Sequence, residues 1–262
     1  MGFYEKDGLR YYQFDIFKDQ PIFHAIMTRH AGYSKPPYDS LNTGGTVGDD
    51  PKAVLKNHQK IYQVFGVDYF SRLDVWQVHG THILCGEAPR VPETPHIMAD
   101  GILTNKNDIT LFMRFADCVP ILLWDPVVEV IGIAHAGWQG TSQKITQGIV
   151  EKMVERYGSD PKNILAAIGP SICQDCYEVG KEVKAAFDSK FGKSAERFFR
   201  DKNGRLFLDL WKANQQTLNN AGVEKIEVSK QCTACHIEDW YSYRAENGRT
   251  GRFGVLMKIQ DQ

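Results

Sequence analysis

Short apolar runs rich in β-branched and aromatic residues alternate along the chain with segments in which apolar residues recur at helical spacing. The short runs are bounded by turn residues, which is typical of strands. They predict strands at residues 22–28, 75–79, 109–115, 119–124, 127–134, 164–168, 226–228, 241–244 and 253–259. Helical spacing predicts helices at residues 51–65, 145–157, 181–191 and 209–221.

Turn residues define the connections between these elements. The segment 29–50 is rich in Gly, Pro, Asn and Asp and predicts a long loop, and loops of that length are usually functional. Pro51 suits the first turn of the helix that follows, and Gly66 ends its pattern. Residues 86–95 predict a surface excursion. Because no linker or internal repeat is found, we expect one α+β domain over residues 1–262.

Composition narrows the class of protein. With 262 residues, 42% of them apolar and 24% charged, the chain is long enough for a full core and lies in the ordinary globular range. The net charge of −1 does not favour nucleic acid as the main partner. Apolar stretches such as residues 118–124 fall short of the about 20 residues that span a membrane. With no signal-peptide pattern at the start, we expect a cytoplasmic protein, either a monomer or a homodimer.

Three metal-binding residue types occur next to turns at the ends of predicted strands. His79 precedes Gly80, Cys118 follows Ala116-Asp117, and His135 precedes Ala136-Gly137. Two imidazoles and a thiolate are three ligands for a catalytic zinc with one open position. The alternative is that they are buried core residues. His82 is a possible substitute ligand or a general base, but it points away from His79 if both lie on a strand, so we favour His79.

Residues that recognise anions lie close to these positions. The turn from Gly137 to Gly140 leads to Thr141, a good N-cap, and free N–H groups at a helix start favour an anion. An ordinary strand-to-helix connection is the alternative. Candidate phosphate or substrate contacts in glycine-rich loops are Arg29, Asn42, Arg244, Arg249 and Arg252, each with surface charge or loop polarity as the alternative. Asp117 and Glu178 are candidate carboxylates for proton transfer or ribose binding.

The remaining cysteines include two C-x-x-C pairs, Cys173/Cys176 and Cys232/Cys235. The 55 residues between the pairs are many more than a zinc ribbon allows. Ordinary thiols are therefore the favoured interpretation, with a second zinc site and a redox pair as alternatives.

Several short motifs follow one another along nearly the whole chain. They are Thr28-Arg29-His30-Ala31-Gly32-Tyr33-Ser34, Ser40-Leu41-Asn42, Gly48-Asp49-Asp50-Pro51, Gln77-Val78-His79-Gly80, Ala99-Asp100-Gly101, Ala116-Asp117-Cys118-Val119-Pro120-Ile121, Ala134-His135-Ala136-Gly137-Trp138, Ile168-Gly169-Pro170, Tyr177-Glu178-Val179-Gly180, Tyr243-Arg244 and Thr250-Gly251-Arg252. In this order they resemble the YfiH-like family, whose members are also called laccase-domain proteins, polyphenol oxidases and multifunctional purine nucleoside phosphorylases.

The resemblance implies an α+β fold with two β-sheets sandwiched between helical layers, an α-β-β-α order. It also implies a zinc ion bound by His79, Cys118 and His135. The implied reactions are phosphorolysis of adenosine, inosine, guanosine and methylthioadenosine, and deamination of adenosine. The chain departs from the family pattern at Gln139 and Ala245, where the family usually has Arg, and at His58, where Asn-Arg is usual after Asp-Pro. Gln139 removes a cation where an anion contact is expected.

We therefore predict a zinc-dependent purine nucleoside phosphorylase that binds purine nucleosides and phosphate, with His79, Cys118, His135 and Asp117 as catalytic residues. The expected substrate or phosphate contacts are Arg29, Asn42, Gly137, Thr141, Glu178 and Arg244. A copper-dependent polyphenol oxidase is the first alternative, because two His and one Cys also suit copper. The others are a metal or cysteine hydrolase that edits peptidoglycan precursors, with Cys118 as nucleophile and His135 as base in the cysteine case, and a module with a purely structural zinc.

Overall fold

Two six-stranded sheets lie face to face in the computed structural model, which describes residues 1–260. The first sheet has the order β1 (Gly2–Lys6), β2 (Leu9–Gln13), β3 (Ile22–Met27), β15 (Phe253–Ile259), β7 (Thr110–Phe115) and β4 (Arg72–Leu73). The second has the order β14 (Lys225–Val228), β10 (Leu165–Ile168), β8 (Val119–Asp125), β9 (Val130–Ala136), β6 (Gly101–Thr104) and β5 (Ile83–Cys85). Their strands come from all parts of the chain.

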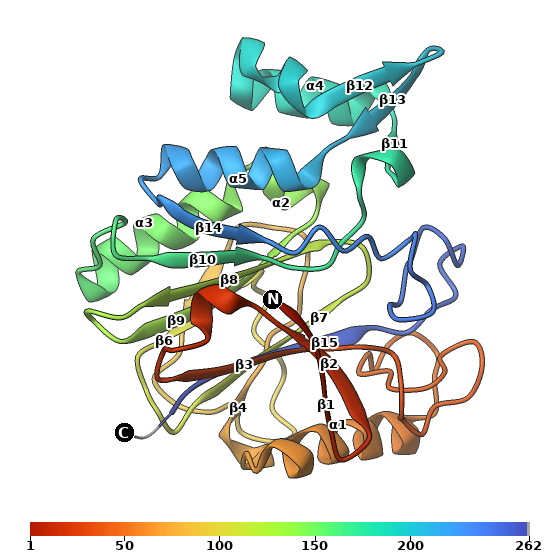
Figure 1. The fold of residues 1–262 in the computed structure, drawn as a ribbon, viewed down its shortest axis with the longest axis vertical. Coiled ribbons are helices and arrows are strands. Elements are labelled where there is room, and N and C mark those ends of the chain that lie inside the picture. The colour runs from red at the N-terminus through yellow and green to blue at the C-terminus, as the bar shows by residue number, and fades with distance from the viewer. Residues whose placement is uncertain (261–262) are drawn as a thin grey trace.

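Helices cover both outer faces of this pair (Figure 1). Helix α1 (Pro51–Phe65) lies on the first sheet, and α2 (Trp138–Ser142), α3 (Ile145–Tyr157) and α5 (Leu210–Asn220) lie on the second. Farther out, α4 (Lys181–Phe191) adjoins a small sheet of β11 (Glu178–Val179), β13 (Arg205–Leu208) and β12 (Phe199–Lys202). Short 3₁₀ turns are η1 (Asp15–Phe17), η2 (Tyr69–Ser71), η3 (Gln174–Cys176) and η4 (Gly192–Phe198).

Three apolar clusters fill the three spaces between these layers. Trp124 and Met113 belong to the cluster between the two sheets, and Phe112 and Ile61 to the one beneath α1. The third contains Ile149 and joins the second sheet to its helices. The predicted α-β-β-α order is therefore confirmed, with the small sheet as an addition that the sequence did not indicate.

The central strands are apolar throughout because both of their faces are buried. In β8, Leu122 and Trp124 point toward the first sheet, whereas Ile121 and Leu123 alternate with them toward the helices. Burying both sets removes several hundred Å² of apolar surface from water, at about 25 cal/mol per Å². This accounts for the continuous run that the sequence showed at residues 119–124.

Helix α1 begins and ends as predicted. The Asp50 side chain accepts a hydrogen bond from the Lys52 N–H, and Pro51 occupies the first turn. Gly66 ends the helix in the left-handed region at φ 67°. Ile61 and Tyr62 are buried against the first sheet.

Two predicted strands are absent and a third is shorter. Residues 75–79 form only an isolated bridge, between Trp76 and Met98, because the chain turns at His79 with φ 61°. Residues 241–244 contain no strand and lead into a turn that begins at Tyr243, although Tyr241 is buried like a strand residue. Strand β9 starts at Val130, since Asp125 accepts a hydrogen bond from the Val127 N–H and forms a turn first.

Most of the strands that the sequence did not indicate are polar or short; β2 is the exception, because Leu9, Tyr11 and Tyr12 are buried. Strands β1 and β12 expose most of their side chains, so no buried face imposed a period-two pattern on them. Strands β5 and β6 have three and four residues and pair in parallel with each other.

No helix within residues 1–260 is long and apolar enough to cross a membrane.

His24 is a buried histidine whose contacts require the neutral ring. Its side chain lies on β3, with 3% of the residue surface exposed. Nε2 accepts a hydrogen bond of 2.8 Å from the Phe14 N–H, and the rings of Phe14 and Phe17 both pack against the imidazole. Burial lowers the pKa of His24 to about 3.

We predict that His24 makes the protein less stable as the pH falls below about 6.5, because the unfolded chain then binds a proton that the folded chain excludes. The slope is about 1.4 kcal/mol per pH unit between the two pKa values. In His24→Gln, the amide oxygen can also accept from the Phe14 N–H. Between pH 6 and 4, the slope of the unfolding free energy against pH should be smaller in this variant by the equivalent of about one bound proton. Denaturant titrations measure this, and equal slopes in both proteins would contradict it.

Candidate active site and metal centre

Three separate segments bring His79, Cys118 and His135 together. His79 lies in the loop between β4 and β5, Cys118 directly precedes β8, and His135 lies in β9. Strands β8 and β9 are antiparallel with Pro120 opposite His135, so Cys118 and His135 lie at the same end of the pair. The ligand atoms of the three side chains all lie within 4.8 Å of one another.

This arrangement fits a tetrahedral metal ion. Zinc bonds of about 2.0–2.1 Å to nitrogen and 2.3 Å to sulfur place two nitrogen ligands and one sulfur ligand about 3.3–3.6 Å apart. The His79 and His135 rings meet edge to face, with centroids 4.9 Å apart. His135 is buried, Cys118 is partly buried and His79 is exposed, so the set is closed on the protein side and open toward solvent. Three ligands with one open side are typical of catalytic zinc.

Asp100 supports both imidazole ligands. Its carboxylate is fully buried and accepts hydrogen bonds from the backbone N–H groups of Val78, His79 and Gly80. Oδ1 also lies 2.9 Å from Nδ1 of His135. When the Nδ1–H of His135 donates its hydrogen bond to Asp100, Nε2 of His135 carries no proton and is free to bind a metal.

The backbone around the ligands is strained in a way that Asp100 compensates. His79 adopts φ 61°, which costs a non-glycine residue about 1–3 kcal/mol. Three N–H bonds to one carboxylate stabilise the turn in this conformation. A straight strand at residues 75–79 would point the His79 side chain elsewhere.

Gly137 is required by the close approach of the ligands. A Cβ at this position would lie 2.9 Å from Cys118 Sγ and 3.0 Å from His79 Cδ2. The predicted role of Gly137 as a phosphate contact stays a prediction. Its visible role is to leave room for the sulfur and the imidazole.

Cys118 and His135 shift each other's pKa toward the charged forms. Burial disfavours the thiolate, but the two imidazoles outweigh burial and lower the pKa of Cys118 to about 6. Burial also disfavours the imidazolium, yet Cys118 and Asp100 raise the pKa of His135 to about 9. Cys118 is thus predisposed to the thiolate form in which sulfur binds metals.

The ligands open into a cavity of about 870 Å³. Its walls combine cations with aromatic rings. The residues that line it are Gly44, Gly45, Thr46, Val47, Val75, Trp76, Gln77, His79, His96, Arg114, Ala116, Asp117, Cys118, His135, Trp138, Gln139, Tyr177, Tyr243, Arg244, Gly248 and Arg252. The long loop 29–50, predicted to be functional, therefore supplies one wall through Gly44–Val47.

Asp117 and Arg244, both predicted, are neighbours on this wall. The Asp117 carboxylate accepts hydrogen bonds from the hydroxyls of Thr233 and Ser242 and from the Arg244 backbone N–H. Burial raises the pKa of Asp117 despite these donors. The Arg244 guanidinium donates to the Glu178 carbonyl oxygen. Asp117 thus fixes the backbone of the residue that carries a guanidinium into the cavity.

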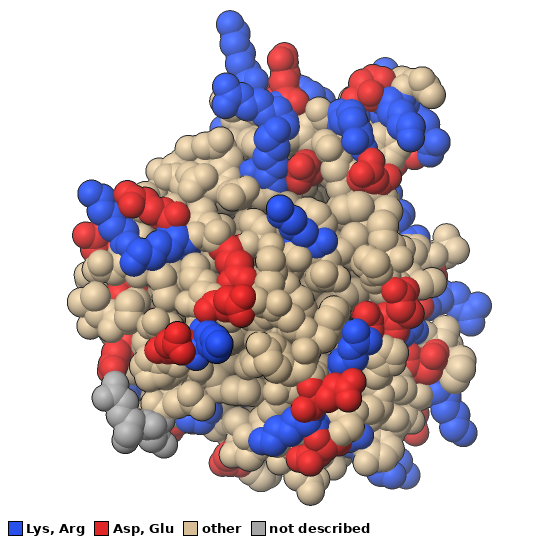
Figure 2. Space-filling model, viewed as in Figure 1, with Lys and Arg blue, Asp and Glu red and all other residues tan. Residues whose placement is uncertain are grey.

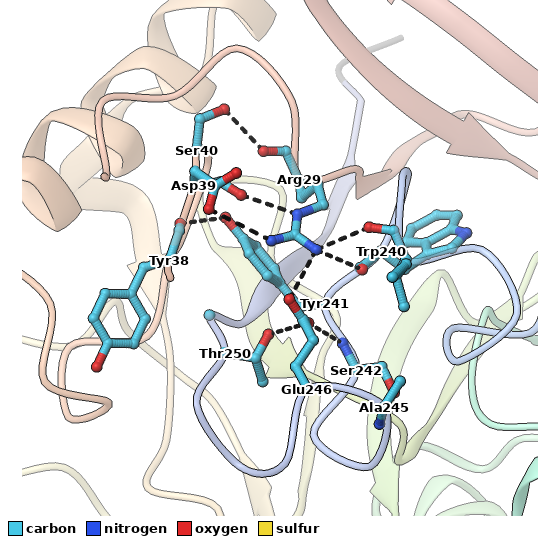
Figure 3. Close-up of polar contacts among 12 residues, drawn as sticks. Arg29, Tyr38, Asp39, Ser40, Trp240, Tyr241, Ser242, Ala245, Glu246 and Thr250 are labelled. Atoms are coloured by element: carbon cyan, nitrogen blue, oxygen red, sulfur yellow. Dashed lines mark hydrogen bonds and ion pairs between the residues drawn. The ribbon is translucent and has the colours of Figure 1, made fainter. Parts of the chain in front are cut away.

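Arg29 lies outside the cavity lining and joins two loops instead (Figure 3). Its guanidinium donates to the carbonyl oxygens of Asp39, Ile237 and Trp240 and pairs with Glu246. It also lies over the Tyr241 ring, at 4.6 Å from the centroid. With its donors occupied by protein groups, its predicted contact with a substrate has no support from its position.

Asn42, Glu178 and Thr141 also lie outside the lining, as do Gly137 and the exposed Arg249. Asn42 is buried and accepts from the N–H groups of Gly44 and Arg252, so it positions two residues that do line the cavity. Glu178 pairs with Arg205 on the surface. Thr141 is buried, and its hydroxyl accepts a hydrogen bond from the Asn214 amide.

The helix expected after the Gly137 turn has a different form. Gly137, rather than Thr141, is the N-cap, and α2 has only five residues. Lys144 then takes φ 62°, and α3 starts at Ile145. A helix this short has few aligned peptide dipoles, so the predicted attraction of an anion to its N-terminus is weak.

Sequence reasoning missed Asp100 and Arg114. Asp100 carried no signal beyond its place in the Ala-Asp-Gly motif, because its partners lie far away along the chain. Arg114 lies within an apolar strand, which is itself a signal, since an arginine there requires a buried partner. Its guanidinium pairs with the buried Asp74 at 2.5 Å and donates to the Thr43 carbonyl oxygen.

We predict that Asp100→Asn weakens zinc binding by about 10–100-fold, because the amide provides neither the charge nor the full set of acceptors for His135 and the 78–80 turn. Competition with a chromophoric chelator measures this affinity. Asp125→Asn is the matched control, a buried aspartate at the far end of β8. Equal zinc affinities of the Asp100→Asn variant and the control would refute the supporting role of Asp100.

Comparison with known proteins agrees with this fold. Residues 23–260 match the family described as multi-copper polyphenol oxidoreductase laccase. A purine nucleoside phosphorylase of Deinococcus radiodurans is 40% identical over 238 residues, which cover 90% of this chain and 88% of that protein. Purine nucleoside phosphorylase YlmD of Bacillus subtilis is 34% identical over 251 residues, 93% of this chain and 90% of that protein.

A solved structure extends the match to the whole fold. The crystal structure of YlmD from Geobacillus stearothermophilus superposes with a TM-score of 0.92 at 30% identity, over 99% of both chains. The chain therefore belongs to the laccase-domain family that contains the YfiH and YlmD proteins.

Proposed function

We propose that this chain is a zinc-dependent purine nucleoside phosphorylase. Adenosine, inosine, guanosine and methylthioadenosine are its substrates, and adenosine is also deaminated at the same site. The observation that carries the proposal is the convergence of His79, Cys118 and His135 on one wall of a cavity lined by arginines and aromatic rings. The relatives named purine nucleoside phosphorylase support it.

The cavity suits both reactants in size and chemistry. A volume of about 870 Å³ lies in the range typical of sites for small molecules. Trp138 and Tyr177 offer flat faces on which a purine can stack. Arg244 and Arg252 place guanidinium groups in the same cavity, and guanidinium is the preferred partner of phosphate.

In phosphorolysis, a phosphate oxygen forms a bond to ribose C1′ as the bond from C1′ to the purine nitrogen breaks, and the base leaves with a proton. Arg244 is preorganised to orient the phosphate, because Asp117 fixes its backbone and the Glu178 carbonyl takes one of its donors. Arg252 is tied to the carbonyl oxygens of Thr250 and Gly251. Fixed donors need little reorganisation as charge develops.

The metal ligands would be His79, Cys118 and His135, and zinc bound there would supply a Lewis acid that also makes water more acidic near neutral pH. Asp100 keeps the Nδ1 proton of His135 away from the cavity. We assign to Asp117 the positioning of Arg244 rather than proton transfer, because three donors already occupy its carboxylate oxygens.

Two other activities have a specific observation in their favour. The family description and the His₂Cys ligand set favour a copper-dependent oxidation of phenols. The proximity of Cys118 to His135, with a pKa of Cys118 lowered by the imidazoles, favours a cysteine hydrolase. Oxygen uptake with a phenol identifies the first. Alkylation of Cys118 without a chelator, together with loss of activity, identifies the second.

The expected setting of the protein also stays a proposal. We place it in the cytoplasm, as one domain over residues 1–262 that forms a monomer or a homodimer and does not bind nucleic acid. On the face shown in Figure 2, Lys and Arg side chains are interspersed with those of Asp and Glu. The Lys and Arg side chains are most frequent around α4 and the β12–β13 hairpin. Such mixed charge does not favour a polyanion.

We predict that the zinc-loaded protein releases adenine from adenosine only when phosphate is present, whereas inosine appears with or without phosphate. His79→Ala should lower both rates by more than about 100-fold, since even the partners of zinc ligands contribute 10–100-fold. His82→Ala is the control, an exposed histidine outside the ligand cluster, and should retain both rates. If neither adenine nor inosine forms, the proposed function is wrong.

We further predict that Gln139→Arg lowers the KM for phosphate by up to about tenfold, because a guanidinium at the cavity adds a charge-assisted contact. Gln143→Arg adds the same charge outside the lining and should leave that KM unchanged. Initial rates at varied phosphate concentration measure both constants. An equal fall in the two variants would assign the effect to general charge rather than to position 139.

A further inference from the structure

The two C-x-x-C pairs form a second cluster of thiols, here called the Cys₄ cluster: Cys173, Cys176, Cys232 and Cys235. Strands β10 and β14 are parallel neighbours, with Ile168 opposite Val228. The segments that follow them therefore leave the sheet side by side, and Ser171 bridges to Cys232. The long separation in sequence argued against a shared site, and the parallel pairing removes that objection.

The geometry of the Cys₄ cluster suits a metal ion. All four sulfur atoms lie within 4.8 Å of one another, and those of Cys176 and Cys235 are 3.4 Å apart. A tetrahedral zinc with bonds of about 2.3 Å to sulfur places its ligands about 3.8 Å apart. The Cys173 N–H lies 3.3 Å from Cys232 Sγ and donates to it, which stabilises a thiolate there.

Disulfides account less well for the same arrangement. A disulfide needs about 2.05 Å between two sulfur atoms and involves cysteines in pairs. All four cysteines are free thiols here, and each lies close to the three others. Mutual proximity of four sulfur atoms is what a single central ion requires.

We propose that the Cys₄ cluster binds a zinc ion through four thiolates, and that this ion fastens together the two segments that carry one wall of the cavity. Four protein ligands complete the tetrahedron and leave no position for a substrate, so the role is structural. This site is separate from the His79, Cys118 and His135 centre and does not rest on the proposed function.

Contacts from the Cys₄ cluster lead directly to the cavity. Thr233, between Cys232 and Cys235, donates a hydrogen bond to Asp117, and the Ile172 N–H donates to the Asp117 carbonyl oxygen. Tyr177 follows Cys176 directly and lines the cavity. The ion would thus hold together the two segments that contact Asp117, the residue directly before Cys118.

Metal analysis of the whole protein tests the proposal. We expect about two zinc ions per chain in the wild type and about one in the Cys176→Ser/Cys235→Ser double variant. Cys85→Ser is the matched control, a cysteine outside both clusters, and should retain both ions. His79→Ala should lose the other ion and retain that of the Cys₄ cluster. No difference in zinc content between the double variant and the control would overturn the proposal.

Alkylation of the wild type gives a test that does not depend on how the variants fold. We expect iodoacetamide to leave the four cysteines unmodified in the native protein and to modify them once a strong chelator is added. Burial cannot explain such protection, because Cys235 is exposed. Modification of the four cysteines before the chelator is added would refute a metal site. Protection that a reductant alone releases would also refute it and would indicate disulfides. Neither outcome bears on nucleoside turnover.

Discussion

The arrangement of the candidate metal centre depends on the hydrogen bonds of one buried carboxylate, that of Asp100. It accepts from three successive N–H groups of the His79 turn and faces Nδ1 of His135, so one charge orients two ligands from distant segments. A buried carboxylate needs such partners, and hydrogen bonds from the turn and from His135 keep its pKa low despite burial. The strained conformation of His79 persists because these bonds compensate it.

Much of the cavity wall is built from loops, and several of these loops are fixed by a buried or half-buried polar residue. Asn42 positions Gly44 and Arg252, and Asp117 positions Arg244. Arg29 joins the loop of Asp39 to the segment around Glu246 (Figure 3). Irregular backbone carries more polar groups than it can satisfy by itself, so side chains that supply several hydrogen bonds become its supports. Several residues that look like substrate contacts in the sequence serve this purpose.

Strands with two buried faces and helices with a buried stripe were predictable, because their burial imposes a composition or a period on the sequence. Residues 119–124 and 253–259 illustrate the first and α1 the second. The edge strand β1 was not predictable, since it buries too little to show a pattern. The strand expected at 241–244 failed for the opposite reason, because Tyr241 is buried by loop packing rather than by a sheet.

The sequence by itself determined which residues are candidate metal ligands, His79, Cys118 and His135, and it placed each of them beside a turn. Tertiary structure decided which polar residues support them, and it brought together Cys173 and Cys232, whose spacing had argued against a common site. The physical reason is that residue type fixes what a side chain can bind, whereas its neighbours are set by strand pairing. Parallel pairing places residues far apart in the chain next to each other, and no local pattern records that distance.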